Sequence, residues 1–447
     1  MDTPICDFVR RYVQSNALRL HMPGHKGRTF LGPENLDITE MDGADSLYEA
    51  EGIIRQSEEN ASSLFGCPTF YSTEGSSQCI RAMLYLAMLW AKENGRKPLI
   101  AAARNVHRSF LSAVALLDLD VMWLYPENAD SYLSCNICAE TLDQLLLTAA
   151  EKLTAVYLTS PDYLGNLADI RQISEICHRH GVMLLVDNAH GAYLRFLEPS
   201  LHPIDLGADL CCDSAHKTLP VLTGGAYLHI APCLEDKLGS QAKHALALFG
   251  STSPSYLILQ SLDRANAYLE GYRQTLSPYL LRIKELKEDL VNAGYVLLDR
   301  EPTKLTISAK PYGYLGTELA HILLENNIVC EFSDPDYLVL MLTPENDETE
   351  LSRLRSALLS VSRKTPVSEL PPIPSRGVLS MSIREAMLSP FEVISVEKSE
   401  GRILASPSVG CPPAVPIIIC GEQINSNTIK CFQYYNIHTM AVVKEHN

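Results

Sequence analysis

The chain has 447 residues, a hydrophobic share of 46%, a charged share of 20% and a formal net charge of −16. This length suits two or three domains, and the composition is typical of a globular protein. The acidic balance argues against nucleic acid or an anionic membrane as a partner. The start of the chain has no apolar signal segment, and no run approaches the length that spans a bilayer, so we expect a cytoplasmic location.

The 13 cysteines are scattered along the chain. Because no secretion signal accompanies them, we expect reduced thiols. Cys135 and Cys138 form a C-x-x-C pair, but a zinc site needs further ligands, and no second pair lies at a suitable spacing. We therefore expect no metal site.

Short apolar runs alternate with amphipathic segments between residues 60 and 230. This pattern predicts a mostly parallel α/β sheet covered by helices on both faces, in which ligands bind beyond the carboxyl ends of the strands. The expected strands are 68–73, 98–103, 120–126, 155–161, 182–187, 209–214 and 225–230. The expected helices are 76–95, 138–152 and 169–181.

The second half of the chain predicts a smaller α+β domain. A long helical stretch covers 253–294, a helix is expected at 315–327, and the tail at 411–424 is expected to hold an apolar strand closed by a glycine. Two further strands are expected at 304–309 and 337–343. We predict an N-terminal arm (1–30), a large domain (31–265) and a C-terminal domain (266–447) with a proline-rich linker near 364–376.

Three polar features follow strands of the large domain. Asp187 ends one strand, His190 lies just after it, and Lys217 follows another strand. Each has an ordinary reading as a cap, a core histidine or a surface lysine. A single hypothesis explains all three: a lysine amine can hold pyridoxal phosphate, and an acid can keep its ring nitrogen protonated. Ser76 and Ser77, after a glycine and before a helix, provide a phosphate site at a helix N-terminus.

With these motifs the sequence resembles the Orn/Lys/Arg decarboxylase family of fold type I pyridoxal-phosphate enzymes. The resemblance covers nearly the whole chain and implies an aspartate-aminotransferase-like fold in the short form, without the N-terminal wing domain. It rests on "LHMPGHKG" (20–27), "ARNVHRSF" (103–110), "SPDYLGNLADI" (160–170), "VDNAHGAY" (186–193), "DSAHKTLPVLTGGAYL" (213–228), "STSPSYLILQSLD" (251–263) and "PPAVPIIICGEQI" (412–424), with a further block at 38–66.

The resemblance also implies roles for individual residues. Lys217 would hold the cofactor covalently, Asp187 would pair with its ring nitrogen, and His107 would stack on the ring opposite Ala189. His190 would lie near the phenolic oxygen or the substrate carboxylate. Phosphate contacts would come from Ser76, Ser77, Ser214 and His216, and from Thr252 in the loop 251–253 of a second subunit, because the site of this fold lies at a dimer interface.

The chain departs from the family pattern at several positions. Gln78 stands where a hydroxyl is common, and Cys79 where a glycine is common. Asn188 replaces the usual acid after the catalytic aspartate. Asp162 replaces a common threonine, and Cys420 replaces a proline. These departures leave the identity of the substrate open.

The expected reaction is decarboxylation of arginine, lysine or ornithine to an amine that feeds polyamine synthesis. Two alternatives remain: another pyridoxal-phosphate reaction, such as transamination or aldol cleavage, and a non-catalytic homologue. An aminotransferase would need an arginine for the substrate carboxylate, for which Arg376 or Arg384 could serve. The acids that could meet the distal group of a basic substrate are Asp42, Asp45, Glu49, Glu51 and Glu422.

Overall fold

The computed structural model describes residues 1–96, 98–126, 131–149, 151–298, 300–407 and 414–445. Its strands are β1 (Thr69–Ser72), β2 (Leu99–Ala103), β3 (Asp120–Leu124), β4 (Ala155–Thr159), β5 (Met183–Asp187), β6 (Leu210–Asp213), β7 (Ala226–Ile230), β8 (Val296–Leu298), β9 (Lys304–Ser308), β10 (Phe332–Ser333), β11 (Tyr337–Met341), β12 (Phe391–Ser395) and β13 (Thr439–Val443). Its α-helices are α1 (Pro4–Gln14), α2 (Ile53–Phe65), α3 (Ser76–Glu93), α4 (Arg108–Leu117), α5 (Ala139–Ala149), α6 (Ile170–Arg179), α7 (Ala215–Thr218), α8 (Ser240–Ala247), α9 (Tyr256–Leu269), α10 (Tyr272–Asn292), α11 (Gly316–Glu325), α12 (Glu348–Leu359), α13 (Ile383–Leu388) and α14 (Ser426–Tyr434).

The large sheet has the strand order β1-β7-β6-β5-β4-β2-β3. β5 pairs in parallel with β6, and β2 pairs in parallel with β3, whereas β7 runs antiparallel to both β6 and β1. Since β5 and β6 are parallel neighbours, their carboxyl ends lie at the same edge of the sheet. The predicted mostly parallel α/β sheet is therefore confirmed.

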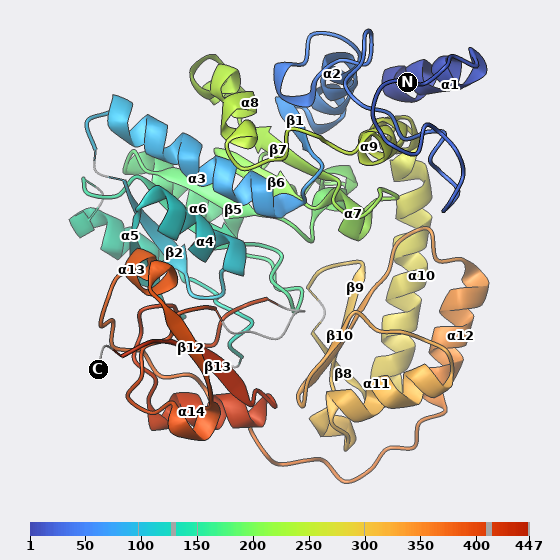
Figure 1. Ribbon diagram of the computed structural model, residues 1–447. Coiled ribbons are helices and arrows are strands. Elements are labelled where there is room, and N and C mark those ends of the chain that lie inside the picture. The colour runs from blue at the N-terminus through green and yellow to red at the C-terminus, as the bar shows by residue number, and fades with distance from the viewer. Residues whose placement is uncertain (97, 127–130, 150, 299, 408–413, 446–447) are drawn as a thin grey trace. The chain divides into compact units, whose positions relative to one another are not determined.

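The chain divides into two compact units, the first formed by residues 1–98, 143–158 and 169–276. In this unit α3 packs across β5, β6 and β7 (Figure 1), and α6 packs against β5. The sequence explains α6 directly. The Asp169 side chain accepts a hydrogen bond from Gln172 N at its start, Ile173 and Cys177 on one face are buried, and Gly181 with φ 65° follows its end.

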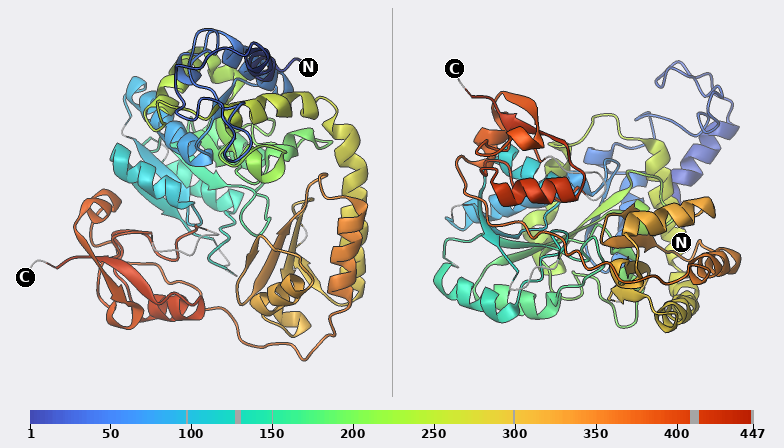
Figure 2. Two further views of the ribbon diagram at one scale, coloured as in Figure 1. Left: turned by 45° about the vertical axis from the view of Figure 1, so that its right-hand side comes forward. Right: turned by 90° about the horizontal axis from the view of Figure 1, so that it is seen from below.

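The second unit comprises residues 99–142, 159–168 and 277–447. It contains a four-stranded antiparallel sheet of order β10-β11-β9-β8 and a separate β12–β13 pair. Residues 362–378 form no helix or strand, and α14 runs beside the β12–β13 pair (Figure 2). The smaller α+β region expected in the second half is present, while the three-part division into domains stays a prediction.

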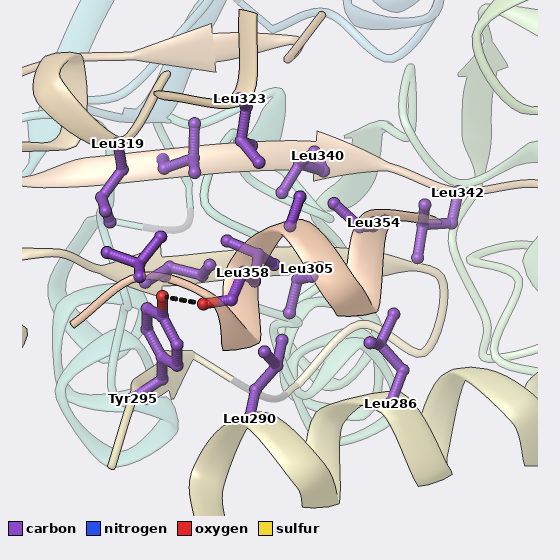
Figure 3. Packing of buried hydrophobic residues seen from close by; sticks show 14 of the residues in the cluster. Leu286, Leu290, Tyr295, Leu305, Leu319, Leu323, Leu340, Leu342, Leu354 and Leu358 are labelled. Carbon is purple, nitrogen blue, oxygen red and sulfur yellow. Dashed lines mark hydrogen bonds between the residues drawn. The ribbon is translucent and has the colours of Figure 1, made fainter. Parts of the chain in front are cut away.

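Leucines from the helices and strands of the second unit form one buried core (Figure 3). Leu286 and Leu290 of α10 face Leu305 of β9 and Leu358 of α12, and the Tyr295 hydroxyl donates a hydrogen bond of 2.8 Å to the Leu358 carbonyl. This core accounts for the long apolar periodicity of α10, whose solvent-facing side is charged.

Two expected elements differ from the structure. The helical stretch 253–294 is split into α9 and α10 by a turn at Glu270–Gly271, because glycine has low helix propensity. The expected tail strand is wrong for residues 414–420, which form no strand, while 411–413 lie outside the described residues. Ile417 to Cys420 are buried as an irregular segment instead, and Gly421 with φ 91° turns the chain after them.

Candidate active site

Asp187 is buried at the carboxyl end of β5, with 2% of its surface exposed. One carboxylate oxygen accepts a hydrogen bond of 3.1 Å from the Ala189 backbone N–H and a weak one of 3.7 Å from the Cys212 thiol. The other oxygen accepts a long hydrogen bond of 3.3 Å from the Tyr157 hydroxyl. A buried carboxylate with one backbone donor and two longer contacts favours the approach of a cation.

The electrostatics of Asp187 agree with this reading. Burial raises the pKa of Asp187, and the positive charge of Lys217 acts against that rise. The lysine therefore lies within electrostatic reach of the carboxylate that was predicted to face the cofactor's ring nitrogen.

Lys217 lies on the short helix α7, directly after β6. Its Nζ is 3.0 Å from Nε2 of His190, which follows β5 and is 6% exposed. Because β5 and β6 end at one edge of the sheet, Asp187, His190 and Lys217 come together there. Their chemical roles stay predictions.

Hydroxyl groups gather near the start of α3. Ser76 and Ser77 form the first turn of this helix after Gly75, whose φ of 71° suits glycine. The Ser214 hydroxyl donates a hydrogen bond of 2.8 Å to the Ser76 hydroxyl. Two serines from separate segments thus meet at a helix N-terminus, which suits an anion such as a phosphate group.

His216 and Thr252 were also predicted to contact a phosphate. His216 Nδ1 donates a hydrogen bond of 3.0 Å to the Gly225 carbonyl, and burial lowers the pKa of its imidazole. Thr252 lies in an exposed loop. Its predicted contact would be made to a second subunit and stays a prediction, as does that of His216.

Gln78 has a structural explanation that the sequence did not provide. Its side chain is fully buried, and Nε2 donates to the Tyr48 hydroxyl at 2.9 Å and to the Leu246 carbonyl at 2.8 Å. Its amide oxygen accepts from the Ser72 hydroxyl. The Gln78 amide is thus occupied by core groups. Cys79 is likewise fully buried.

His107 and Ala189 were expected on opposite faces of the cofactor ring. Ala189 is buried two residues after Asp187. His107 belongs to the second unit and caps α4, where its Nδ1 accepts a hydrogen bond of 3.2 Å from Ser109 N. With Nδ1 as an acceptor, a neutral His107 carries its proton on Nε2. The stacking role of both residues stays a prediction.

Two of the five acids considered for the distal group are already engaged. The Asp45 carboxylate accepts backbone hydrogen bonds around the start of α2, and its pKa is lowered by those bonds against the opposing effect of burial. Glu422 is paired with Arg104 at 2.6 Å. Arg384, a candidate for an aminotransferase, donates to the Ala115 carbonyl at the end of α4. The exposed acids Asp42, Glu49 and Glu51 remain as candidates.

The sequence alone missed Tyr157 and Cys212, which touch Asp187. Each lies on a buried strand adjacent to β5 in the sheet. The sequence did offer a signal for both residues: a polar side chain within an otherwise apolar buried strand needs a hydrogen-bond partner. Asp162, another departure from the family pattern, forms a turn by accepting from the backbone N–H groups of Leu164 and Asn166, both at 2.9 Å.

The comparison with protein families shows that the chain is an amino-acid decarboxylase. The chain belongs to the Orn/Lys/Arg decarboxylase family: residues 3–298 match its major domain and residues 380–444 match its C-terminal domain. The "Uncharacterized protein YaaO" of Bacillus subtilis is 30% identical over 96% of this chain and 93% of its own length. An arginine decarboxylase of Halalkalibacterium halodurans is 29% identical over 99% of this chain and 98% of its own.

Solved structures share the fold. The lysine decarboxylase LdcF of Francisella novicida superposes with a TM-score of 0.80 at 18% identity, covering 99% of this chain and 81% of that one. Lysine decarboxylase A from Pseudomonas aeruginosa gives a TM-score of 0.81 at 17% identity, covering 99% and 80%. Among the described residues, no helix has the length and apolar character needed to cross a bilayer.

Proposed function

We propose that the protein uses pyridoxal phosphate to decarboxylate a basic amino acid, with arginine as the substrate to test first. The observation that carries this proposal is the buried Asp187 carboxylate, which lies within electrostatic reach of Lys217 at one edge of the sheet. Such a pair suits an aldehyde cofactor with a basic ring nitrogen.

The residues present fit this cofactor. Lys217 provides the amine, and Asp187 provides the acceptor for a protonated ring nitrogen. Ser76, Ser77 and Ser214 provide hydroxyl groups at the N-terminus of α3 for the phosphate. When bound, the cofactor supplies an electron sink for the pair that remains on Cα after carbon dioxide leaves.

Lys217 and His190 would manage the protons of the reaction. The 3.0 Å contact between Lys217 Nζ and His190 Nε2 would let the two side chains share a proton. The proton that Cα needs would come from Lys217 or a histidine. A poorly solvated place for the substrate carboxylate would favour its loss, because its charge disappears in the transition state.

Arginine is preferred over lysine because of the relatives. Four similar bacterial proteins, 27–29% identical over nearly all of this chain, carry the name arginine decarboxylase. The protein named lysine decarboxylase LdcA is 25% identical over 59% of this chain. The amine formed would enter polyamine synthesis. We further propose a cytoplasmic homodimer with the active site at its interface.

The test is to supply the purified protein with pyridoxal phosphate and to offer arginine, lysine and ornithine separately. We expect release of carbon dioxide and the matching amine, fastest from arginine. Formation of a keto acid instead would favour an aminotransferase. Failure to bind pyridoxal phosphate at all would favour a non-catalytic homologue and overturn the proposal.

A further inference from the structure

A second buried carboxylate, that of Asp213, ends strand β6 directly before Ser214. Its side chain has no exposed surface. One carboxylate oxygen accepts hydrogen bonds of 3.1 Å from Nε2 of His202 and of 3.1 Å from Nε2 of His229, and both imidazoles are also fully buried. Because a carboxylate only accepts, each imidazole carries its proton on Nε2.

The other carboxylate oxygen of Asp213 faces Asn188. The Asn188 amide nitrogen donates to it at 2.7 Å, and the Cys211 thiol lies 3.8 Å from the same oxygen. Burial alone would raise the pKa of Asp213, but the two histidines outweigh it and hold the pKa well below its usual range. Asp213 is therefore a buried, charged carboxylate with N–H donors on both of its oxygens.

Asp213 and its hydrogen-bond partner Asn188 are direct sequence neighbours of residues predicted to bind the cofactor. Asn188 directly follows Asp187, and Asp213 directly precedes Ser214, whose hydroxyl meets Ser76. The Asn188 backbone N–H also donates to the Cys212 carbonyl at 3.0 Å. Moving Asp213 would thus disturb both the loop that starts at Asp187 and the strand end that carries Ser214.

The Asn188 side chain has little freedom to find another partner. The loop turns tightly, since the Gly191 N–H donates to the Asn188 carbonyl at 2.8 Å. A Cβ at Gly191 would lie 2.0 Å from the Asn188 amide oxygen, so only glycine lets the chain pass this close. Asn188 stands where the resemblance implies an acid, and its amide donates to the Asp213 carboxylate.

We propose that Asp213, held by His202 and His229, is a positioning residue that fixes the Asp187–Asn188 loop and the Ser214 strand end for cofactor binding. The inference rests on the proposed use of pyridoxal phosphate. Asp213 acts through Asn188 and Ser214, so its loss weakens cofactor binding more than a comparable loss elsewhere in the same core.

The strongest competing reading of this cluster is a metal site. Ligand atoms of His202, Cys211 and Asp213 lie within 4.8 Å of one another. The hydrogen bonds between the imidazoles and the carboxylate already account for these three residues without an ion. Stoichiometric zinc in the purified protein, lost in His202→Ala, would overturn the interpretation of this cluster as a hydrogen-bond network.

The decisive experiment uses three variants: Asp213→Asn, Asn188→Asp and the double exchange. Asp213→Asn replaces the charged acceptor, and Asn188→Asp sets two carboxylates against each other where a 2.7 Å hydrogen bond now lies. In the double exchange, the amide oxygen at position 213 can accept from both imidazoles while its NH2 group donates to the new carboxylate at position 188. The double exchange therefore restores the hydrogen bond between positions 188 and 213, with position 213 now the donor and position 188 the acceptor.

We expect each single variant to raise the dissociation constant for pyridoxal phosphate by roughly 10- to 100-fold, as for outer-shell partners of bound groups. The double exchange should return it to within about threefold of the wild type, because the hydrogen bonds are restored. Cofactor titration followed by absorbance and thermal unfolding of the apo-protein should be measured together.

Asp209→Asn is the matched control. Asp209 is also a buried aspartate bonded to a histidine, with His178 Nε2 at 3.0 Å, but it lies directly before β6 rather than at its carboxyl end. We expect Asp209→Asn to lower thermal stability without changing the dissociation constant. Equal effects of Asp209→Asn and Asp213→Asn on both quantities, or no recovery in the double exchange, would overturn the proposal.

Hydrogen exchange of the apo-protein separates this inference from the proposed function. Asp213→Asn should speed exchange of the backbone N–H groups of Asn188 and Gly191, whether or not any cofactor binds. If the wild type fails to bind pyridoxal phosphate, the proposed function falls while this exchange result still reports on the loop. Unchanged exchange at both groups would overturn the positioning role itself.

Discussion

The ends of β5 and β6 carry two buried aspartates with opposite electrostatics. Asp187 receives one backbone N–H, a long tyrosine hydroxyl bond and a thiol, and burial raises its pKa. Asp213 receives two imidazole N–H groups, an amide and a thiol, and its pKa is lowered because the histidines outweigh burial. Both side chains are buried, with 2% of Asp187 and 0% of Asp213 exposed, so the contrast comes from the hydrogen-bond donors and not from depth.

The hydrogen-bond donors distinguish a structural carboxylate, Asp213, from an available one, Asp187. A buried charge is tolerated when its hydrogen bonds are complete, and it favours a cation when they are not. Asp213 accepts from three N–H donors within the fold. The donors described for Asp187 are one backbone N–H, a long tyrosine hydroxyl bond and a thiol, as expected for the partner of a protonated ring nitrogen.

The largest effect is expected from the cation that faces Asp187. Lys217→Ala should abolish the visible absorbance of a lysine-bound cofactor and slow carbon dioxide release by roughly 10²–10⁴-fold, because a covalent anchor and a proton donor are lost. The matched control is Lys237→Ala, which removes an exposed lysine of the same unit. Retention of the visible band in Lys217→Ala would place the cofactor elsewhere.

Removing the charge of Asp187 should have the next largest effect. Asp187→Asn leaves a buried cationic ring nitrogen without its counter-charge, a loss of about 3–5 kcal/mol in cofactor binding. Equilibrium titration with pyridoxal phosphate measures it. An unchanged dissociation constant would mean that Asp187 does not meet the ring nitrogen.

The pH dependence of apo-protein stability should separate the two aspartates. The folded-state pKa of Asp187 lies above 3.8, so its contribution to the free energy of unfolding falls as pH rises from 3.8 through the raised value. The folded-state pKa of Asp213 lies below 3.8, so its contribution is present above that pH and is lost as pH falls through the lowered value.

At neutral pH, Asp187→Asn should therefore raise the melting temperature of the apo-protein, and Asp213→Asn should lower it, each by about 2 °C or more. Thermal unfolding across a pH series measures both. Shifts of the same sign in the two variants would remove the contrast between the strand ends.

The smallest effect is expected from the two thiols. Cys212→Ala removes a donor that lowers the pKa of Asp187, so the fall in apo-protein stability should extend to higher pH than in the wild type. Cys211→Ala should leave the Asp213 contribution in place, because three N–H donors remain. The same unfolding series, repeated on both variants, provides the measurement.

The sequence predicted much of the site because its signals are local. Strand ends at Asp187 and before Lys217, and the Gly-Ser-Ser start of α3, can be read from apolar periodicity and helix-start patterns. The break at Gly271 and the irregular segment 414–420 escaped that reading, since apolar residues there are buried without the regular backbone that periodicity implies.

The α/β class, the seven strands of the large sheet, and the residue types that could hold an aldehyde cofactor and its phosphate can be read from the sequence. Only the tertiary structure decided which buried acid is satisfied. His202 and His229, 11 and 16 residues from Asp213 in the chain, donate to it, and Tyr157 donates to Asp187 from another strand. Hydrogen-bond donors for a buried charge come from neighbours in space, and these partners are set by strand order and loop path rather than by local pattern.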